Sequence, residues 1–219
     1  RAILSGAQSL ALLIAGILGI LIGRLSDRLG PRMVMSIAAF FFGLGLLLMS
    51  GVNHVWQLFL FYGVIFGIGL SAIDIIALST TARWFVRRRG TMTGIVKVGT
   101  GAGQLVMPLV ASLLIADYGW RTSYVIIGAA AMVLLIFIGQ FLRRDPVQMG
   151  LLPDGNKGLR TQSSKLVEID FYIREALRTR QFWTICFAFL ATMFCVLVIM
   201  VHIVPHVTDI GISSTTAAG

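Results

Sequence analysis

The sequence predicts an all-α membrane protein, and three observations lead to this prediction. Of the 219 residues, 57% are hydrophobic and only 12% are charged, whereas soluble domains carry about 25% charged residues. Six apolar runs are each close to or above the length of about 20 residues that a helix needs to cross a bilayer. The basic residues, which give a net charge of +9, lie in short clusters between these runs. That distribution excludes a nucleic-acid partner, because such a partner needs one continuous basic face.

The predicted spans follow one another with short polar connections, except before the last one. The six spans cover residues 3–23, 33–51, 55–81, 90–116, 120–142 and 182–204. The connections 52–54 and 117–119 are three residues long, whereas 143–181 is long and rich in Gly and Pro. Within that long connection, apolar residues at helical spacing over 166–177 predict a short surface helix.

The arginines and lysines predict the orientation of the chain. Fifteen of them lie in the alternate connections 24–32, 83–89 and 143–181, and only Arg1 and Arg121 lie at the opposite ends of the spans. Basic residues collect on the cytoplasmic side of membrane proteins. We therefore predict that these three connections are cytoplasmic and that the protein is an integral protein of the plasma or inner membrane.

The connection between the first two spans carries a charged signature. Gly30-Pro31 ends any helix that runs through it, and Gly23 is expected to allow close backbone approach where the first helix ends. The order Gly-x-x-x-Asp-Arg-x-Gly-x-Arg resembles the loop signature of the major facilitator superfamily of secondary transporters. That resemblance implies a conformational lock at the cytoplasmic face. Its members here are Gly23, Asp27, Arg28, Gly30 and Arg32, with Pro31 departing from the usual basic residue.

A second stretch, residues 84–99, resembles the fifth-helix signature of monocarboxylate transporters. An aromatic pair, a run of arginines and then glycines at Gly94 and Gly99 carry this likeness, while Thr91 and Met92 depart from it. The stretches 117–121, 149–155 and 202–206 are similar to the oxalate/formate antiporter branch of the same group. The alternative explanation, which needs no family signature, is that the aromatic residues and arginines anchor a helix end at the membrane boundary.

These resemblances imply a partial major facilitator bundle with six of an expected twelve transmembrane helices. The visible spans correspond to the second to seventh helices. Residues 1–142 then form the first half without its first helix, residues 143–181 form the cytoplasmic central loop, and residues 182–219 hold the seventh helix and the start of the second half. The resemblance also implies that the cation that binds substrate lies in the first helix or in the second half.

Two charged residues, Asp74 and Lys97, lie well inside predicted spans. Such residues are costly in a bilayer and usually face a partner or a wet cavity. Asp74 lies nine residues before Arg83, and Lys97 lies eight residues after Arg89. At 1.5 Å per residue both are about 12–14 Å from the same boundary. We expect them to pair or to share one cavity; the alternatives are that Asp74 joins the lock by facing Arg28 or Arg83, or that it has a structural partner.

Other polar and flexible positions are candidates for a transport pathway. Gln104 could line it or bond between helices, and His202 could couple transport to protons because histidine titrates near neutral pH. The alternative is that His202 is simply a polar residue at the membrane interface. The pairs Gly19 with Gly23 and Gly63 with Gly67 have the spacing of helix-packing motifs. A further set predicts either static packing or a face that slides and bends: Gly94, Gly99, Gly103 and Pro108.

The function predicted from these features is secondary transport of a small organic anion by alternating access. A proton or a counter-anion is the possible coupled species, and the lipid bilayer is the other partner. The alternatives are a transporter of an unrelated small solute and a receptor-like member that moves none. The spans contain no His-Glu-x-x-His and no Gly-x-Ser-x-Gly, and no phosphate-cradling Walker loop is present, so we predict no enzyme, no cofactor and no metal site.

Overall fold

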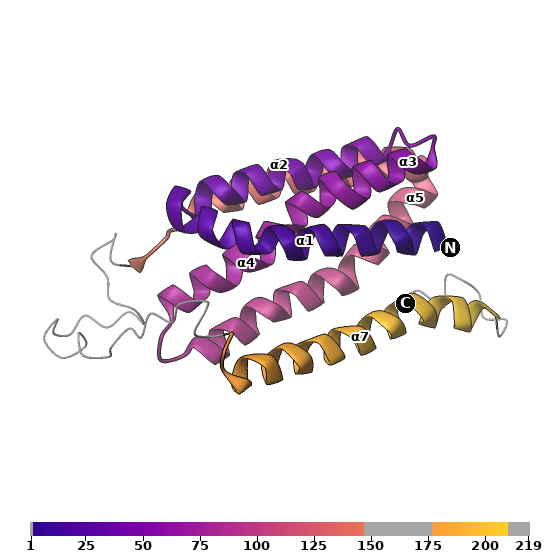
Figure 1. Cartoon of the computed structure of the whole chain (residues 1–219). Helices are drawn as coiled ribbons and strands as arrows, with labels where there is room; N and C mark the ends of the chain where they lie inside the picture. The colour runs from indigo at the N-terminus through magenta and orange to yellow at the C-terminus, as the bar shows by residue number, and fades with distance from the viewer. Residues whose placement is uncertain (1, 147–176, 210–219) are drawn as a thin grey trace, which may run out of the picture. The chain divides into compact units, whose positions relative to one another are not determined.

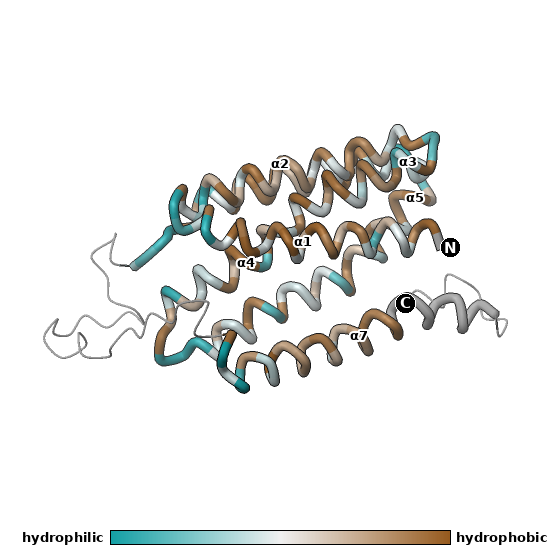
Figure 2. The backbone as a smooth tube through the Cα atoms, viewed as in Figure 1, coloured by the Kyte–Doolittle hydropathy of each residue, from teal (hydrophilic) through white to brown (hydrophobic). Residues whose placement is uncertain are grey.

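The structure is a computed structural model, and it describes residues 2–146 and 177–209. All regular elements among these residues are helices (Figure 1). The chain divides into two compact units, residues 1–157 and 158–219, which are described separately below. Within the described residues, five helices are long and apolar enough to cross a membrane. Figure 2 shows apolar residues along the helices of the first unit and hydrophilic ones at their connections.

The first two helices meet at a single residue. Helix α1 covers Ala2–Leu29 and helix α2 covers Pro31–Met49. Between them Gly30 has a φ of 86°, in the left-handed region that favours glycine, and Pro31 starts α2. The predicted break at Gly30-Pro31 is therefore confirmed. The predicted end of the first helix at Gly23 is wrong: residues 24–29 include three charged residues but no helix breaker, and so α1 continues to Leu29.

The third span contains a wider helical segment. Helix α3 (Val55–Leu58) passes into the π-helix η1 (Phe59–Phe66), which passes into α4 (Gly67–Trp84). Together they form one continuous apolar stretch, three residues longer than the predicted 55–81. A π-helix bonds each amide to the carbonyl five residues back, and such segments are often found at functional sites. Hydropathy does not distinguish this segment from an α-helix.

Helix α5 (Arg89–Phe141) contains both the fourth and the fifth predicted span. Its 53 residues would measure about 80 Å if straight, far more than a bilayer core of about 30 Å. Gly119 breaks it, with φ 76° and ψ 163°. Below, residues 89–118 are called the first leg and residues 120–141 the second leg. The predicted connection 117–119 is therefore present, shortened to one glycine.

The two legs run in opposite directions. On the first leg, an Arg89 guanidinium nitrogen donates to the carbonyl oxygen of Ala82 at 3.1 Å, so this leg starts where α4 ends. On the second leg, Arg121 donates to Asn53 Oδ1 at 2.8 Å, just beyond the end of α2. Near the other end of α2, Gln140 Nε2 donates to Ser36 Oγ at 3.0 Å. The second leg is thus antiparallel to α2, and it lies behind α2 in Figure 1.

The core of the first unit lies between α2, α4 and the second leg of α5. Its largest buried cluster consists of Val34, Met35, Ala38, Ala72 and Ile76. Glycines bring the helices close together: a Cβ at Gly63 would lie 2.7 Å from Leu10 Cδ2, and one at Gly67 would lie 3.0 Å from the carbonyl oxygen of Ala11. Gly63 and Gly67 therefore pack against α1, as their spacing predicts.

The second unit contributes helix α7 (Arg180–Asp209), which corresponds to the predicted span 182–204. The predicted surface helix over 166–177 lies almost entirely outside the described residues. The division into a first half, a central loop and a second half stays a prediction.

Candidate functional site

One ion pair joins the signature turn to the end of α4. Asp27 Oδ1 pairs with Arg83 Nη2, with the two side chains about half and one third exposed. Asp27 lies on the last turns of α1 and Arg83 near the end of α4. The connections that hold Arg28 and Arg88 therefore lie at one end of the first unit, which is called the arginine-rich end below. The alternative in which Arg83 faces Asp74 is wrong, because the carboxylate on Arg83 belongs to Asp27.

The end of α5 is also tied to the arginine-rich end. Arg32 Nε donates to the carbonyl oxygen of Leu142 at 2.6 Å. Trp84 Nε1 donates to the carbonyl oxygen of Arg143 at 3.0 Å. Arg32 on α2 thus binds Leu142, directly after the second leg, and Trp84 at the end of α4 binds the next residue, Arg143. These bonds join α2, α4 and α5 at one place.

The remaining signature residues have different surroundings. Gly30 forms the break between α1 and α2, and Arg28 is exposed on the last turn of α1. Gly23 lies inside α1, and a Cβ on it would meet nothing within 4 Å. The prediction of close backbone approach at Gly23 is therefore wrong within the described part of the chain, where no neighbouring helix lies against that turn. The role of these residues as a conformational lock stays a prediction.

A second ion pair lies within the spans. Lys97 Nζ is 3.2 Å from Asp74 Oδ2, and the side chains are 45% and 63% exposed. Asp74 lies on α4 and Lys97 on the first leg of α5, which run in opposite directions. The pairing predicted from their matched depth is therefore confirmed. Both charges are satisfied by each other, and both are still open to a third group.

The first leg around Lys97 is sparsely packed. A Cβ on Gly94, Gly99 or Gly103 would meet nothing within 4 Å, and Gln104 is exposed. Static packing of these glycines is thus absent from the described part of the chain. The non-helical backbone angles in α5 occur at Gly119, not at Pro108. Bending at Pro108 and sliding along the glycines stay predictions.

Sequence reasoning missed the partners on the second leg. Gln140 donates to Ser36 on α2, and the carbonyl oxygen of Leu142 accepts from Arg32, although 104 and 110 residues separate the partners. A polar residue such as Gln140, within the apolar end of a span, is the signal that could have pointed to this contact. His202 lies on α7, and its predicted coupling role remains a prediction.

Comparisons with known proteins agree with this architecture. The Major Facilitator Superfamily profile matches residues 2–219. The oxalate:formate antiporter of Oxalobacter formigenes is 30% identical over 193 residues, which are 88% of this chain and 43% of that protein. Human monocarboxylate transporter 14 is 31% identical over 162 residues, 73% of this chain and 31% of that protein. The uncharacterized MFS-type transporter YhjX of Escherichia coli is 26% identical over 168 residues, 77% of this chain and 39% of that protein.

The chain spans less than half the length of each of these relatives. The resemblance found in the signature turn and in residues 84–99 is confirmed by the match over nearly the whole chain. Five apolar helices and a membrane-embedded, multi-pass arrangement agree with it. This chain belongs to the Major Facilitator Superfamily, a family of transporters.

Proposed function

We propose that the full-length protein is a secondary transporter of a small organic anion of the monocarboxylate or oxalate/formate class. The observation that carries this proposal is the Asp74–Lys97 ion pair, 3.2 Å apart between two spans. Charges inside a membrane are costly, and those that persist usually mark a substrate or ion pathway. Secondary transporters bind substrate near the middle of the bilayer and expose that site alternately to the two sides.

The pair has the chemistry that an anion pathway needs. The Lys97 ammonium can bind a carboxylate, and Asp74 neutralises it when no substrate is bound. A substrate carboxylate would then compete with Asp74 for Lys97. Because the family resemblance implies a further cation in the first helix or the second half, Lys97 would assist that cation.

The residues near Lys97 on α5 fit the same role. Positions three, four and seven residues apart lie on one side of a helix. Gly94, Gly101 and Gln104 therefore share the side of Lys97, and all three are exposed. We assign this side of the first leg to the substrate pathway. Gln104 would supply a hydrogen-bond donor to a carboxylate.

The names of two relatives support the substrate class. One relative is named as an oxalate:formate antiporter and another as a monocarboxylate transporter. By analogy, the substrate proposed here is a small carboxylate, with a proton or a counter-anion as the coupled species and His202 as a candidate coupling residue. The signature turn would act as the cytoplasmic lock, and Gly94, Gly99, Gly103 and Pro108 would let α5 move. The protein would therefore move its substrate across the plasma or inner membrane without chemical change.

Counterflow tests this proposal. Full-length protein is reconstituted in vesicles loaded with oxalate, formate or lactate, and uptake of the labelled anion is measured. We expect uptake that depends on the trapped anion, and we expect Lys97→Ala to lower its rate at least about tenfold, because the variant leaves Asp74 unpaired in the pathway.

The matched control is Ser112→Ala, which lies on the same leg and removes only a hydrogen bond to the carbonyl oxygen of Leu109. Its rate should equal that of the unchanged protein. If no anion is exchanged by the unchanged protein, the proposed substrate class is wrong, and the remaining readings are an unrelated solute or a receptor-like member. Full counterflow in Lys97→Ala would remove the ion pair from the mechanism.

A further inference from the structure

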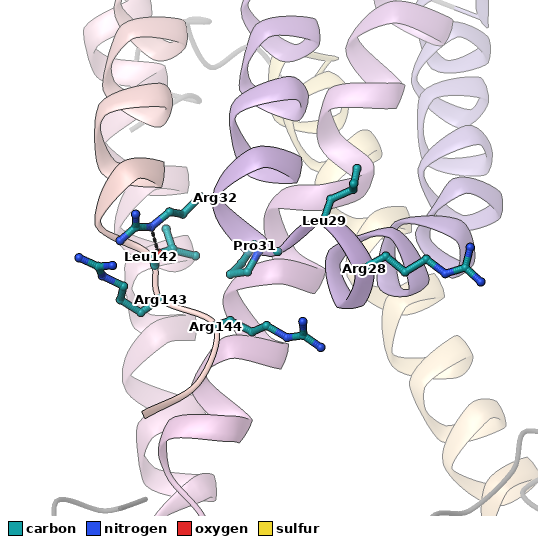
Figure 3. A pocket seen from close by; sticks show the side chains of 8 residues that line it. Arg28, Leu29, Pro31, Arg32, Leu142, Arg143 and Arg144 are labelled. Atoms are coloured by element: carbon teal, nitrogen blue, oxygen red, sulfur yellow. Dashed lines mark hydrogen bonds between the residues drawn. The ribbon is translucent and has the colours of Figure 1, made fainter. Parts of the chain in front are cut away.

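A pocket of about 280 Å³ lies at the arginine-rich end, where the break between α1 and α2 meets the end of α5 (Figure 3). Eight residues line it, and four of them are arginines: Arg28, Arg32, Arg143 and Arg144. We propose that this pocket binds a phosphate group, carried either by a lipid headgroup or by a soluble phosphate. The proposal does not depend on what the protein transports.

The charges around the pocket are unbalanced. Among the described residues, the carboxylate that contacts these arginines is that of Asp145, 3.4 Å from Arg144 Nε. Asp27 lies next to Arg28 in the sequence, but it is engaged by Arg83. In the described part of the chain, one carboxylate, paired with Arg144, thus stands against four arginines, and an anion in the pocket would offset their excess positive charge.

The free donors suit a phosphate. Arg32 uses its Nε on Leu142, and its two terminal nitrogens make no hydrogen bond in the described part of the chain. In the view of Figure 3, Arg32 and Arg143 lie on one side of Pro31, Arg144 extends below Pro31, and Arg28 points outward on the other side. Arg144 Nε is buried, and although it lies 3.4 Å from Asp145 Oδ2 it makes no hydrogen bond among the described residues. A guanidinium presents a planar fork of donors that matches two phosphate oxygens at once.

The start of α2 adds a further positive charge. Gly30, Pro31 and Arg32 line the pocket, and they are also the N-cap and first residues of α2. No side chain caps this helix, and its first turn has no acidic residue. The positive end of the helix dipole is therefore uncompensated at the same place. An anion bound there would act as the missing cap.

The experiment uses the full-length protein in nanodiscs and compares two phosphate sources. In the first arm, discs of phosphatidylcholine with added phosphatidic acid are analysed by native mass spectrometry for retained lipid. In the second arm, inorganic phosphate is added to protein in phosphatidylcholine discs, and the melting temperature is measured. The pocket variant is Arg143→Gln with Arg144→Gln. The control, Arg24→Gln with Arg88→Gln, removes two exposed arginines outside the pocket at the same end.

We expect the unchanged protein and the control to retain phosphatidic acid or to be stabilised by phosphate. The pocket variant should bind at least about tenfold more weakly, since it loses two charge-assisted donors. Arg143→Lys with Arg144→Lys keeps the charge without the fork and should bind with intermediate affinity, which also separates loss of binding from loss of folding. Retention of the lipid alone identifies a headgroup, and a response to phosphate alone identifies a soluble ligand. Equal losses in pocket variant and control, or no binding in either arm, would overturn the proposal.

Discussion

The glycines of the first unit have opposite surroundings in two regions. In the packed region, made by α1, α2, η1, α4 and the second leg, a Cβ at Gly45 would lie 2.7 Å from the backbone nitrogen of Phe66, and one at Gly69 would lie 2.3 Å from that of Phe42. In the first leg of α5, a Cβ on Gly94, Gly99 or Gly101 would meet nothing within 4 Å.

This difference shows that the glycines of the first unit do not all bring helices together. In lipid there is little hydrophobic force between helices, so that close contact between backbones must hold the packed region together. Among the described residues, the first leg has no such contacts at the glycines 90, 94, 99, 101 and 103, and its Lys97 pairs with Asp74 on α4. In the part of the chain that the structure describes, the first leg therefore has one side, that of its glycines, on which no neighbouring helix packs.

The largest expected effect is on the packed side. Gly69→Ala would place a methyl group against the backbone of α2 at Phe42, where no flexible side chain can move aside. Overpacking of this kind costs about 1–3 kcal/mol, and contact with backbone puts the cost near the upper end. We expect a lower melting temperature in detergent and a smaller monodisperse peak on size-exclusion chromatography.

Gly45→Ala, at the contact of α2 with η1, is a second variant in the same region and should be destabilised as well. Unchanged melting of both variants would mean that the packed region tolerates separation of its helices. The contrast with the first leg would then have no energetic meaning.

An intermediate effect is expected at the link between the two regions. Asp74→Ala leaves Lys97 as an unpaired charge inside a span, and a lysine at a helix centre costs about 2.5–3.5 kcal/mol. Because Lys97 is partly exposed, we expect a loss nearer 2 kcal/mol. The double variant Asp74→Ala with Lys97→Met removes both charges and should melt at a higher temperature than the single variant.

Thermal unfolding of the unchanged protein, Asp74→Ala, Lys97→Met and the double variant in one detergent gives the coupling free energy of the pair. If the double variant is less stable than Asp74→Ala, then Lys97 stabilises the fold through a group other than Asp74. The first leg would then be held by something other than the ion pair.

Local rules predicted part of this architecture. Gly30 and Pro31 allow no continuous helix, and counting residues from Arg83 and Arg89 put Asp74 and Lys97 at equal depth, so the break and the pair could be read from sequence. The continuation of α1 to Leu29 was missed because charged residues outside the bilayer remain good helix formers. The π-helix η1 was missed because its apolar residues have the same hydropathy in either kind of helix.

Contacts between distant segments could not be read in this way. The bond from Arg32 to Leu142 spans 110 residues, and no local pattern indicates it. The same holds for the glycines. Gly63 and Gly67 have the same spacing as Gly99 and Gly103, yet the first pair packs against α1 and the second pair meets nothing within 4 Å. Spacing identifies a smooth helix face, but the neighbouring helix depends on the topology of the whole bundle.

The smallest effect on stability is expected at Gly101. Variants at this position test most directly whether the glycines of the first leg differ in role from those of the packed region. Gly101→Ala adds a methyl group to open space. Its free energy of unfolding should therefore stay within about 0.5 kcal/mol of that of the unchanged protein, as is usual for surface changes, and its melting temperature should be nearly the same. Gly101→Leu should also fold, yet it places a bulky side chain one turn from Lys97. If this side of the first leg faces the substrate pathway, counterflow should fall in Gly101→Leu and remain high in Gly101→Ala. If melting falls in step with counterflow, the face is covered by another helix in the full-length protein and its glycines serve packing, as those of α4 do.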